Sequence, residues 1–333
     1  MNRTGARRIV FYTRYGSQAG SSRTRAFEYV EPLQRLGFTV SIVARVNEAG
    51  RVRAAAFEDL LAQAEDALVV VQKPNLTFTQ LNTLLRITDG GVVADFDDAI
   101  WMGYGPGDPP DGIESIIATL RAAETVTTGS RYLARWARNV GSRRVVVIPP
   151  SIDLNRYRVI RMHHDVPRPV VVWIGTSGNF GDLDVARGAM EKLLADRTIR
   201  FRVISDRPLD WPDTEFVPWS FADEAAQLGA CDIGIMPLVD NERTRGRCGY
   251  KAVQYQAAGL PVVASPVGGA QEVVRHQITG IFANSAREWT IALEALARSA
   301  KLRADLGRAA RKNVEQQHSI AHNAGQVAAI CAR

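Results

Sequence analysis

Two series of alternating strand-like and helical runs, separated by a proline-rich stretch, constrain the fold of this chain more than any other feature of its sequence. Short apolar, β-branched runs typical of buried strands alternate with segments whose apolar residues recur at helical spacing. Parallel sheets with helical crossovers produce this alternation. Between Pro149 and Pro169 the rhythm stops, and four prolines without a clean period indicate a linker. The chain is therefore predicted to be an α/β protein with two Rossmann-like domains in tandem.

The predicted elements follow one another in two runs on either side of this linker. In the first run, strands are predicted at 9–12, 39–44, 68–72, 92–95, 125–128 and 145–148, and helices at 25–36, 57–64, 77–87 and 131–139. In the second run, strands are predicted at 170–174, 201–204, 215–217, 233–236 and 262–263, and helices at 183–194, 222–228, 252–257, 286–298, 301–315 and 320–330. We assign residues 1–160 to an N-terminal domain, 161–317 to a C-terminal domain and 318–333 to a closing C-terminal helix.

The bulk composition is that of an ordinary globular protein, with 333 residues, 46% hydrophobic content and 23% charged content. The cysteines Cys231, Cys248 and Cys331 show neither metal spacing nor an even framework, so a reducing compartment and a cytoplasmic location are expected. The apolar run near the N-terminus covers only Ile9–Tyr12, which is too short for a signal peptide. No run approaches the roughly 20 apolar residues that a membrane helix needs.

The net charge of +6 and the pI near 9.4 point to an anionic partner. The basic residues are spread along the chain and interleaved with acids, and no zinc-finger, RNA-recognition or helix-turn-helix pattern is present. Nucleic-acid binding is therefore not favoured. Phosphate-bearing substrates account better for the excess of arginine, and peripheral contact with the inner face of an anionic membrane is allowed without being required.

The stretch from Arg247 to Gly269 (RCGYKAVQYQAAGLPVVASPVGG) reads as a loop, a helix, a glycine turn, a buried strand and a glycine loop. Gly259 can supply the left-handed residue that ends a helix, and Val262 and Val263 suit a buried parallel strand. Lys251 and a cluster of arginines accompany the helix N-terminus, where unpaired N–H groups attract an anion. The predicted anion is the diphosphate of a nucleotide sugar. The arginines of the cluster are Arg243, Arg245 and Arg247.

Five pieces of the chain, in the right order, resemble the retaining glycosyltransferases of family four, also called group 1 glycosyltransferases. The resemblance covers nearly the whole chain. It implies the GT-B fold, in which two Rossmann-like domains face each other across a cleft and the second binds a nucleotide-sugar donor. The five pieces are DFDDAIW (95–101), VVVIPPSID (145–153), VVVWIGTSGN (170–179), CDIGIMPL (231–238) and YKAVQYQAAGLPVVASPVGG (250–269).

The chain departs from the family pattern around the donor loop. The family carries two glutamates with seven residues between them, and these positions fall on Gly246 and Gln254 here. Gln254 can still hydrogen-bond ribose hydroxyls, whereas Gly246 has no side chain. The basic pair that many members carry after the second-domain glycine loop is also missing from 175–181. We expect Lys251 and the arginine cluster to supply that charge instead.

Two polar stretches of the first domain are candidates for contact with the donor or acceptor. Asp97 or Asp98 is expected at the carboxyl end of a strand, where it would meet hydroxyls. Binding of a divalent metal by the Asp95–Asp97 pair, or simple capping of the loop at 99–103, are the alternatives. The loop 16–25 (GSQAGSSRTR) could approach a phosphate, with Arg23 and Arg25 binding the anion, or could be a flexible loop capped by Ser22.

The predicted N-terminal domain contains no histidine. All five lie after residue 160, so none is available there as a general base. His163 and His164 fall in the linker and are expected to be solvated.

The resemblance implies a retaining glycosyltransferase that needs neither a metal nor another cofactor. Its partners would be a nucleotide-sugar donor and a glycan, lipid-linked or small-molecule acceptor, in glycan, glycolipid or polysaccharide biosynthesis. A non-catalytic scaffold that binds a sugar nucleotide or a partner enzyme, and a sugar-nucleotide epimerase, remain the alternatives. The residues assigned to catalysis are Asp97, Asp98, Lys251 and Arg23. The residues assigned to the donor are Gly175, Thr176, Trp219, Arg245, Arg247, Gly249, Tyr250, Lys251 and Gln254.

Overall fold

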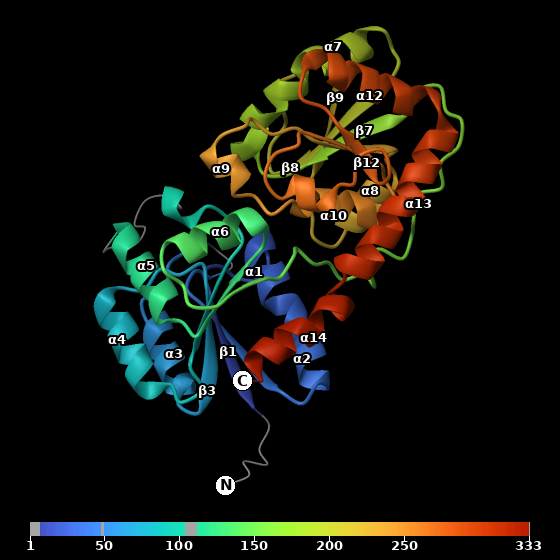
Figure 1. Cartoon of the computed structure of the whole chain (residues 1–333). Coiled ribbons are helices and arrows are strands. Elements are labelled where there is room, and N and C mark those ends of the chain that lie inside the picture. The colour runs from blue at the N-terminus through green and yellow to red at the C-terminus, as the bar shows by residue number, and fades with distance from the viewer. Residues whose placement is uncertain (1–6, 48–49, 104–111, 333) are drawn as a thin grey trace. The chain divides into compact units, whose positions relative to one another are not determined.

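The computed structural model describes residues 7–47, 50–103 and 112–332 of the chain. The chain divides into two compact units, each a parallel sheet with helices (Figure 1). The α/β architecture predicted from the alternating pattern is confirmed. The first unit comprises Met1–Ser151, Gly246–Cys248 and Ile320–Arg333, and the second comprises Ile152–Arg245 and Gly249–Ser319.

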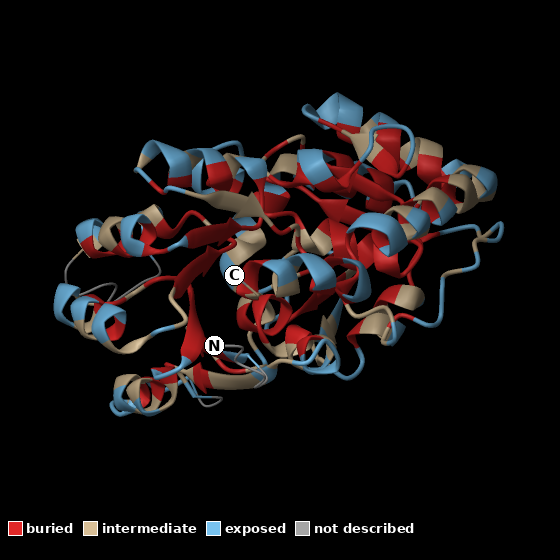
Figure 2. Cartoon of the chain, turned by 60° about the horizontal axis from the view of Figure 1, so that its bottom comes forward, coloured by how far each residue is buried: buried red, intermediate tan, exposed pale blue. Residues whose placement is uncertain are grey.

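The sheet of the first unit has six strands that pair in parallel in the order β2-β1-β3-β4-β5-β6. The residues of β3 and β4 are buried throughout, because helices lie on both faces of the sheet. Figure 2 shows this burial, with red strands and helices whose outward sides are pale blue. The strands are β1 (Arg8–Thr13), β2 (Thr39–Ala44), β3 (Ala67–Gln72), β4 (Val92–Phe96), β5 (Thr125–Thr128) and β6 (Val145–Val147).

The helices of the first unit are α1 (Gly20–Arg25), α2 (Val30–Arg35), α3 (Ala56–Ala64), α4 (Phe78–Ile87), α5 (Gly112–Ala122), α6 (Arg131–Asn139) and α14 (Ile320–Cys331), with short 3-10 helices η1 (Phe27–Tyr29) and η2 (Ile100–Met102). One face of the sheet packs against α3, α4, α5 and α6, in a core that includes Leu84 and Leu133. The other face packs against α2 and α14, in a core that includes Leu33 and Ile330. The last helix of the chain therefore completes the first unit.

The second unit repeats the design with six parallel strands in the order β12-β11-β10-β7-β8-β9. The residues of β7 and β10 are buried throughout, as their continuous apolar sequences predict. The strands are β7 (Val170–Ile174), β8 (Arg200–Ser205), β9 (Thr214–Pro218), β10 (Ile233–Met236), β11 (Val262–Ala264) and β12 (Gly280–Phe282).

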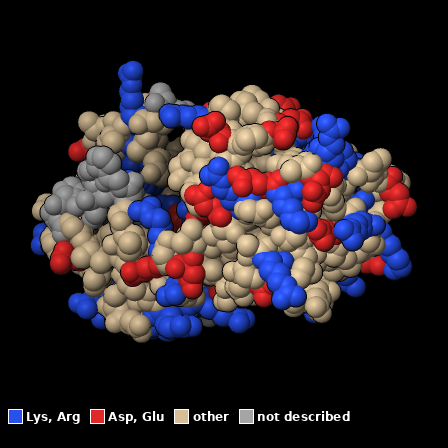
Figure 3. Space-filling model, turned by 90° about the horizontal axis from the view of Figure 1, so that it is seen from above, with Lys and Arg blue, Asp and Glu red and all other residues tan. Residues whose placement is uncertain are grey.

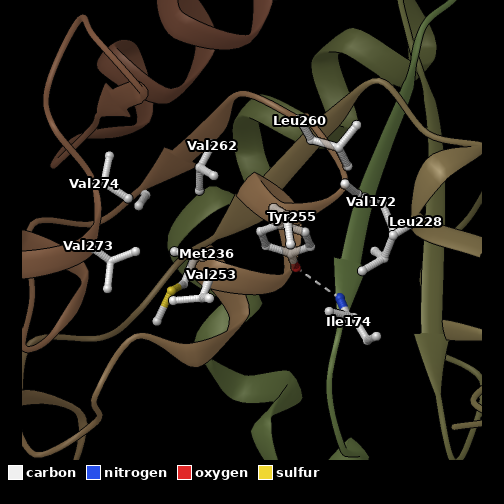
Figure 4. Close-up of a cluster of buried hydrophobic side chains, with 14 of the residues drawn as sticks. Val172, Ile174, Leu228, Met236, Val253, Tyr255, Leu260, Val262, Val273 and Val274 are labelled. Carbon is white, nitrogen blue, oxygen red and sulfur yellow. Dashed lines mark hydrogen bonds between the residues drawn. The ribbon is translucent and has the colours of Figure 1, made fainter. Parts of the chain in front are cut away.

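The helices of the second unit are α7 (Asp184–Ala195), α8 (Glu224–Gly229), α9 (Glu242–Arg245), α10 (Tyr250–Ala257), α11 (Ala270–Val273), α12 (Ala286–Arg298) and α13 (Ala300–Gln317), with the 3-10 helix η3 (Ser177–Leu183). Helices α7 and α12 cover one face of the sheet and α10 covers the other. Tyr255 of α10 reaches the sheet. Its hydroxyl accepts a hydrogen bond from the Ile174 N–H at 3.0 Å (Figure 4) and donates one to the Ile235 carbonyl at 3.0 Å. These bonds fix α10 against β7 and β10.

The structure differs from the predicted elements in a few places. The helix predicted at 25–36 is interrupted at Ala26, whose φ of −137° lies outside the helical region, so that α1 ends at Arg25 and η1 and α2 follow. Helix α5 and strand β12 were not predicted. The prediction that His163 is solvated is wrong, since its side chain is 2% exposed and its Nε2 lies 3.0 Å from the Gly259 carbonyl.

The linker is thereby attached to the second unit. Arg161 donates two hydrogen bonds to Asp232, at 3.0 and 2.8 Å, and the N–H of Val170 donates a third to the same carboxylate. Burial opposes ionisation of Asp232, but hydrogen bonds from His163, Val170 and Arg161 outweigh it and hold its pKa at about 2. Within the described residues, no helix combines the length and the apolar character required to cross a membrane.

Candidate functional site

The first candidate site lies at the carboxyl edge of the first unit's sheet. Lys73 directly follows β3, and Asp97 and Asp98 directly follow β4, which pairs with β3. The Lys73 ammonium lies 3.4 Å from Asp97 and forms a close ion pair with Asp98. Asp97 is buried, whereas the side chain of Asp98 is 47% exposed. Lys73 thus contacts both predicted carboxylates, and Asp98 is the more exposed of the two.

A second set of polar contacts fixes Asp97 from the side of α1. Ser21 donates a hydrogen bond to Asp97 at 2.6 Å, and the side-chain amide of Gln72 donates one to Ser21 at 3.0 Å. Burial raises the pKa of Asp97 above its ordinary value of 3.8, while Lys73 and Ser21 act in the opposite direction. The loop 16–25 therefore contributes a hydroxyl, where the sequence had suggested an arginine–phosphate contact.

Lys73 is the residue of this site that the sequence analysis missed. It adopts φ +49°, a left-handed backbone conformation that few non-glycine residues take. Strain of this kind is concentrated at functional sites. The rule that parallel sheets bind ligands beyond their carboxyl ends would have found it, because Lys73 follows the strand-like run 67–72 directly.

The two arginines of α1 have different surroundings. Arg25 is buried and pairs with Asp95, which also accepts a hydrogen bond from Thr127 at 2.6 Å. This pairing overcomes the cost of burial and raises the pKa of Arg25 further above its ordinary value. Arg23 is also buried, with its guanidinium 3.1 Å from the Gln18 carbonyl and 3.6 Å from Glu28. Arg23 thus ties α1, the helix that carries Ser21, to the preceding residue Gln18 and to Glu28.

The second candidate site lies at the carboxyl edge of the second unit's sheet, where β7 ends at Gly175. A Cβ atom at Gly175 would stand 2.8 Å from both Cε and Nζ of Lys251, so a larger residue there would force the end of the lysine side chain to move. The Lys251 ammonium also lies 4.3 Å from the centroid of the Trp173 ring, within the range of a cation–π contact. Gly175 and Lys251, two residues predicted for the donor, are therefore brought together.

The N-terminus of α10 is shaped by Gly249. Its φ is +85°, and a Cβ atom there would stand 2.9 Å from the backbone of Gly269. Two glycine loops can approach each other only with such a residue. Tyr250 opens the helix and Gln254, one turn on, is 5% exposed. The predicted donor residues Gly249, Tyr250 and Gln254 thus all belong to the start of α10.

The loop after β7 carries the remaining glycine-loop candidate. Thr176 precedes η3, and its hydroxyl accepts a hydrogen bond from Asn179 at 2.9 Å. Asp206 anchors the same loop by accepting bonds from the N–H and the hydroxyl of Ser177, which lower its pKa. The loop is therefore held by carboxylate and amide groups.

Trp219 is half-buried just beyond β9. Its indole N–H donates a hydrogen bond to Glu224 at 2.9 Å, and the hydroxyl of Tyr157 donates one to the same carboxylate at 2.7 Å. Glu224 is 1% exposed, and Arg156 lies 3.8 Å from it. Burial, followed by the charge of Glu224, raises the pKa of Tyr157 well above its ordinary value. The orientation of Trp219 is thus fixed by a buried carboxylate that the sequence analysis did not single out.

The arginine cluster does not act as one group. Arg245 ends the short helix α9 and pairs with Asp240 at 2.6 Å, which lowers the pKa of that carboxyl. Arg243 is exposed, and Arg247 is half-buried in the segment Gly246–Cys248 that groups with the first unit. Among the four cations proposed for the diphosphate, Lys251 lies against Gly175 at the carboxyl edge of the second unit's sheet.

The described residues contain no group of three or more His, Cys, Asp or Glu side chains placed to hold a metal ion. Asp95, the first carboxylate of the Asp95–Asp97 pair, is engaged by Arg25 and Thr127. The pair therefore does not present two open carboxylates to a cation.

Residues 168–299, which form most of the second unit, match the family model described as glycosyl transferases group 1. The D-inositol 3-phosphate glycosyltransferase of Pseudarthrobacter chlorophenolicus is 31% identical over 132 residues, covering 39% of this chain and 30% of the relative. That of Rhodococcus jostii is 29% identical over 233 residues, covering 59% of this chain and 50% of the relative. The chain therefore matches half or less of the length of these curated relatives.

Solved structures extend the likeness to the whole chain at low identity. The Anabaena protein Alr3699/HepE in complex with UDP and glucose superposes with a TM-score of 0.71 and 15% identity, covering 98% of this chain and 99% of that one. A glycosyltransferase from Rickettsia africae ESF-5 gives a TM-score of 0.74 and 14% identity, covering 98% of each chain. The chain has the fold of the GT-B glycosyltransferases. Residues 168–299 of its second unit match the group 1 glycosyltransferase family model, in agreement with the resemblance of the sequence motifs.

Proposed function

We propose that this chain is a metal-independent, retaining glycosyltransferase that moves a sugar from a nucleotide-diphosphate sugar to an acceptor hydroxyl. The proposal rests on the position of Lys251, which lies against Gly175 at the carboxyl edge of the second unit's sheet. The segment that forms this sheet matches the group 1 family model. Open parallel sheets bind their ligands at this edge. A role in glycan, glycolipid or polysaccharide biosynthesis follows from the same proposal.

On this proposal, Lys251 and the N-terminal N–H groups of α10 would bind the donor diphosphate. Charge develops on the diphosphate as the glycosidic bond breaks, and a cation already in position stabilises it without reorganisation. The Trp173 ring and the space left by Gly175 hold the ammonium in place. Gln254 would bond the ribose hydroxyls, since an amide both donates and accepts.

The nucleobase would bind near Trp219. Because Glu224 fixes the indole N–H, the ring is held in one orientation before the donor arrives. UDP-sugars are the first donors to test, since the structure of Anabaena Alr3699/HepE contains UDP.

The acceptor hydroxyl would meet Asp98 in the first unit. Lys73 forms a close ion pair with this partly exposed carboxylate, and a carboxylate oxygen accepts hydrogen bonds from hydroxyl groups. Retention requires no enzymic nucleophile if the acceptor attacks on the side of the leaving diphosphate, which then receives the proton. The curated relatives named for D-inositol 3-phosphate suggest a polyhydroxylated acceptor as the first class to try.

Calorimetry with UDP-, GDP-, dTDP- and ADP-sugars, without added metal, tests the donor site. Wild type should bind one donor class, and Lys251→Ala should bind it much more weakly. Lys312→Ala, which removes an exposed lysine from α13 of the same unit, is the matched control and should bind as wild type does. Release of the nucleoside diphosphate, coupled to sugar transfer onto a polyol or glycan panel, then tests catalysis.

A non-catalytic scaffold is the second candidate, and a specific observation favours it. Gly246 and Gln254 stand where the family carries its two glutamates. Donor binding without hydrolysis or transfer, across the whole acceptor panel, would support the scaffold. Interconversion of donor sugars without any acceptor would instead indicate an epimerase.

A further inference from the structure

Several stretches of the chain contain basic residues without any acidic ones, and residues 125–152 form one of them. On the face in Figure 3, basic and acidic side chains are interleaved. Residues 125–152, by contrast, contain no Asp or Glu. The same stretch contains five arginines. They are Arg131, Arg135, Arg138, Arg143 and Arg144.

Helix α6 arranges three of these arginines as a stripe. Arg131, Arg135 and Arg138 follow one another at spacings of four and three, so they lie on one side of the helix. All three are exposed, while Leu133 and Ala137 on the opposite side are fully buried in the first unit's core. Among the described residues, Arg135 and Arg138 take part in no ion pair. The stripe therefore presents positive charge outward from the unit.

Aromatic side chains flank this stripe. Trp136 of α6 stacks on Trp101, with ring centroids 4.3 Å apart and planes 19° apart. Tyr132 lies beside them, 6.2 Å from Trp101. All three rings are half-buried, and the neighbouring Met102 is 42% exposed. Rings of this kind, partly apolar and partly polar, are favoured at the boundary between lipid and water.

We propose that the arginine stripe of α6 and its aromatic flank (Trp101, Tyr132 and Trp136) form a docking surface for an anionic lipid bilayer. The arginines would contact lipid phosphates, and the aromatic flank with Met102 would lie at the headgroup level. A single-stranded nucleic acid fits less well, because it requires open ring faces for its bases, and Trp101 and Trp136 cover one face of each other. The surface lies within the first unit and goes beyond the proposed transfer reaction.

Flotation with lipid vesicles tests this surface directly. The full chain is mixed with vesicles of phosphatidylcholine alone, or of phosphatidylcholine with phosphatidylglycerol, at low and high salt. We expect binding to the anionic vesicles only, weakened by salt as screening requires. The double variant Arg135→Glu, Arg138→Glu should lose binding by about 30-fold or more.

A matched control separates a local surface from net charge. Arg287→Glu with Lys312→Glu changes the net charge by the same amount at exposed positions of the second unit, and should bind as wild type does. Equal loss in the two double variants, or no preference of wild type for anionic vesicles, would overturn the proposal. Binding of a single-stranded oligonucleotide but of no vesicle would assign the surface to nucleic acid instead.

Two further measurements guard against misfolding and separate this proposal from the transfer reaction. Arg135→Gln with Arg138→Gln removes the charges without reversing them, and its thermal unfolding should match wild type while vesicle binding still falls. Donor binding by both α6 variants should also be unchanged, because the donor residues on α10 lie in the second unit. Loss of donor binding in these variants would count against a purely peripheral role for α6.

Discussion

The Nζ atom of Lys251 lies 4.3 Å from the centroid of the Trp173 ring, and Trp173 is completely buried. An aromatic face attracts a cation, so the ring holds the ammonium beside Gly175 before any ligand binds. Trp173 belongs to β7 and packs in a buried core with residues of α7. A charge fixed in this way costs little reorganisation when a diphosphate arrives.

Lys251→Ala should therefore lower turnover strongly while leaving the fold intact. Loss of one pre-positioned group that stabilises developing charge costs about 10²–10³-fold in kcat. The measurement is the initial rate of nucleoside diphosphate release with saturating donor and acceptor. Lys312→Ala should keep the wild-type rate, and a wild-type rate for Lys251→Ala would remove the lysine from the proposed mechanism.

Lys73 should control the acid limb of the pH–rate profile. Burial raises the pKa of Asp97 and Lys73 lowers it, so removing the ammonium in Lys73→Met should raise that pKa further. The pH below which activity falls should then move upward in Lys73→Met, and Lys73→Arg should restore it. If Lys73→Met retained activity and its acid limb did not shift, the proposed effect of Lys73 on the pKa of Asp97 would be contradicted.

Asp97 should also leave a signature in the pH dependence of stability. Its folded-state pKa lies above 3.8, so the folded protein binds this proton more tightly than the unfolded chain does. The stability that the proton contributes is complete below about pH 4 and is lost as the pH rises through the folded pKa. Urea unfolding at pH 4 and pH 7 should show Asp97→Asn gaining stability relative to wild type as the pH rises. A difference that is constant with pH would show that the carboxyl does not titrate as described.

Removal of Glu224 should destabilise the second unit. Glu224→Ala leaves the Tyr157 hydroxyl and the Trp219 indole N–H without their shared acceptor, at a cost of about 2–5 kcal/mol in the free energy of unfolding. Glu224→Gln retains an acceptor oxygen and should cost less. The exposed neighbour Asp223 provides the control, because Asp223→Ala should change the free energy by no more than about 0.5 kcal/mol.

Two glycine-to-alanine substitutions in the second unit should have opposite signs. At Gly234 of β10 an added Cβ would overlap the Tyr255 ring, so Gly234→Ala should cost about 1–3 kcal/mol or more. At Gly188, in the middle of α7, the same atom meets nothing within 4 Å. Gly188→Ala should therefore stabilise by up to about 1 kcal/mol, since alanine is the better helix former. Urea unfolding of both variants checks the pair, and destabilisation at Gly188 would contradict the packing described for α7.

Much of the fold could be predicted because several strands are continuous runs of apolar or β-branched residues. The runs 39–44, 170–174 and 233–236 coincide with β2, β7 and β10, and the residues of β7 and β10 are buried throughout, as their apolar sequences predict. Strand β12 has only three residues, which is too short for a period to be recognised. The residues around Ala26 also did not predict that the helix expected at 25–36 would be interrupted there.

The candidate sites were predictable where a motif is continuous in the chain. Gly249, Lys251 and Gln254 lie within the short continuous segment 249–254, so the family pattern located them. The Tyr157–Glu224 hydrogen bond joins residues 67 positions apart, and the Lys73–Asp98 pair joins residues 25 apart. Contacts of this range depend on the sheet order, which the order of strands along the chain does not reveal.

The return of α14 to the first unit has a consequence for the order of folding. Ile320, Ala324 and Ile330 cover one face of a sheet whose strands all precede residue 148, so they are synthesised only after the entire second unit. During translation the early sheet emerges with that face covered by α2 but not yet by α14, and long-range closure of such a core is intrinsically slow. Until residues 320–331 arrive, the nascent first unit should be the part of the chain most dependent on chaperones.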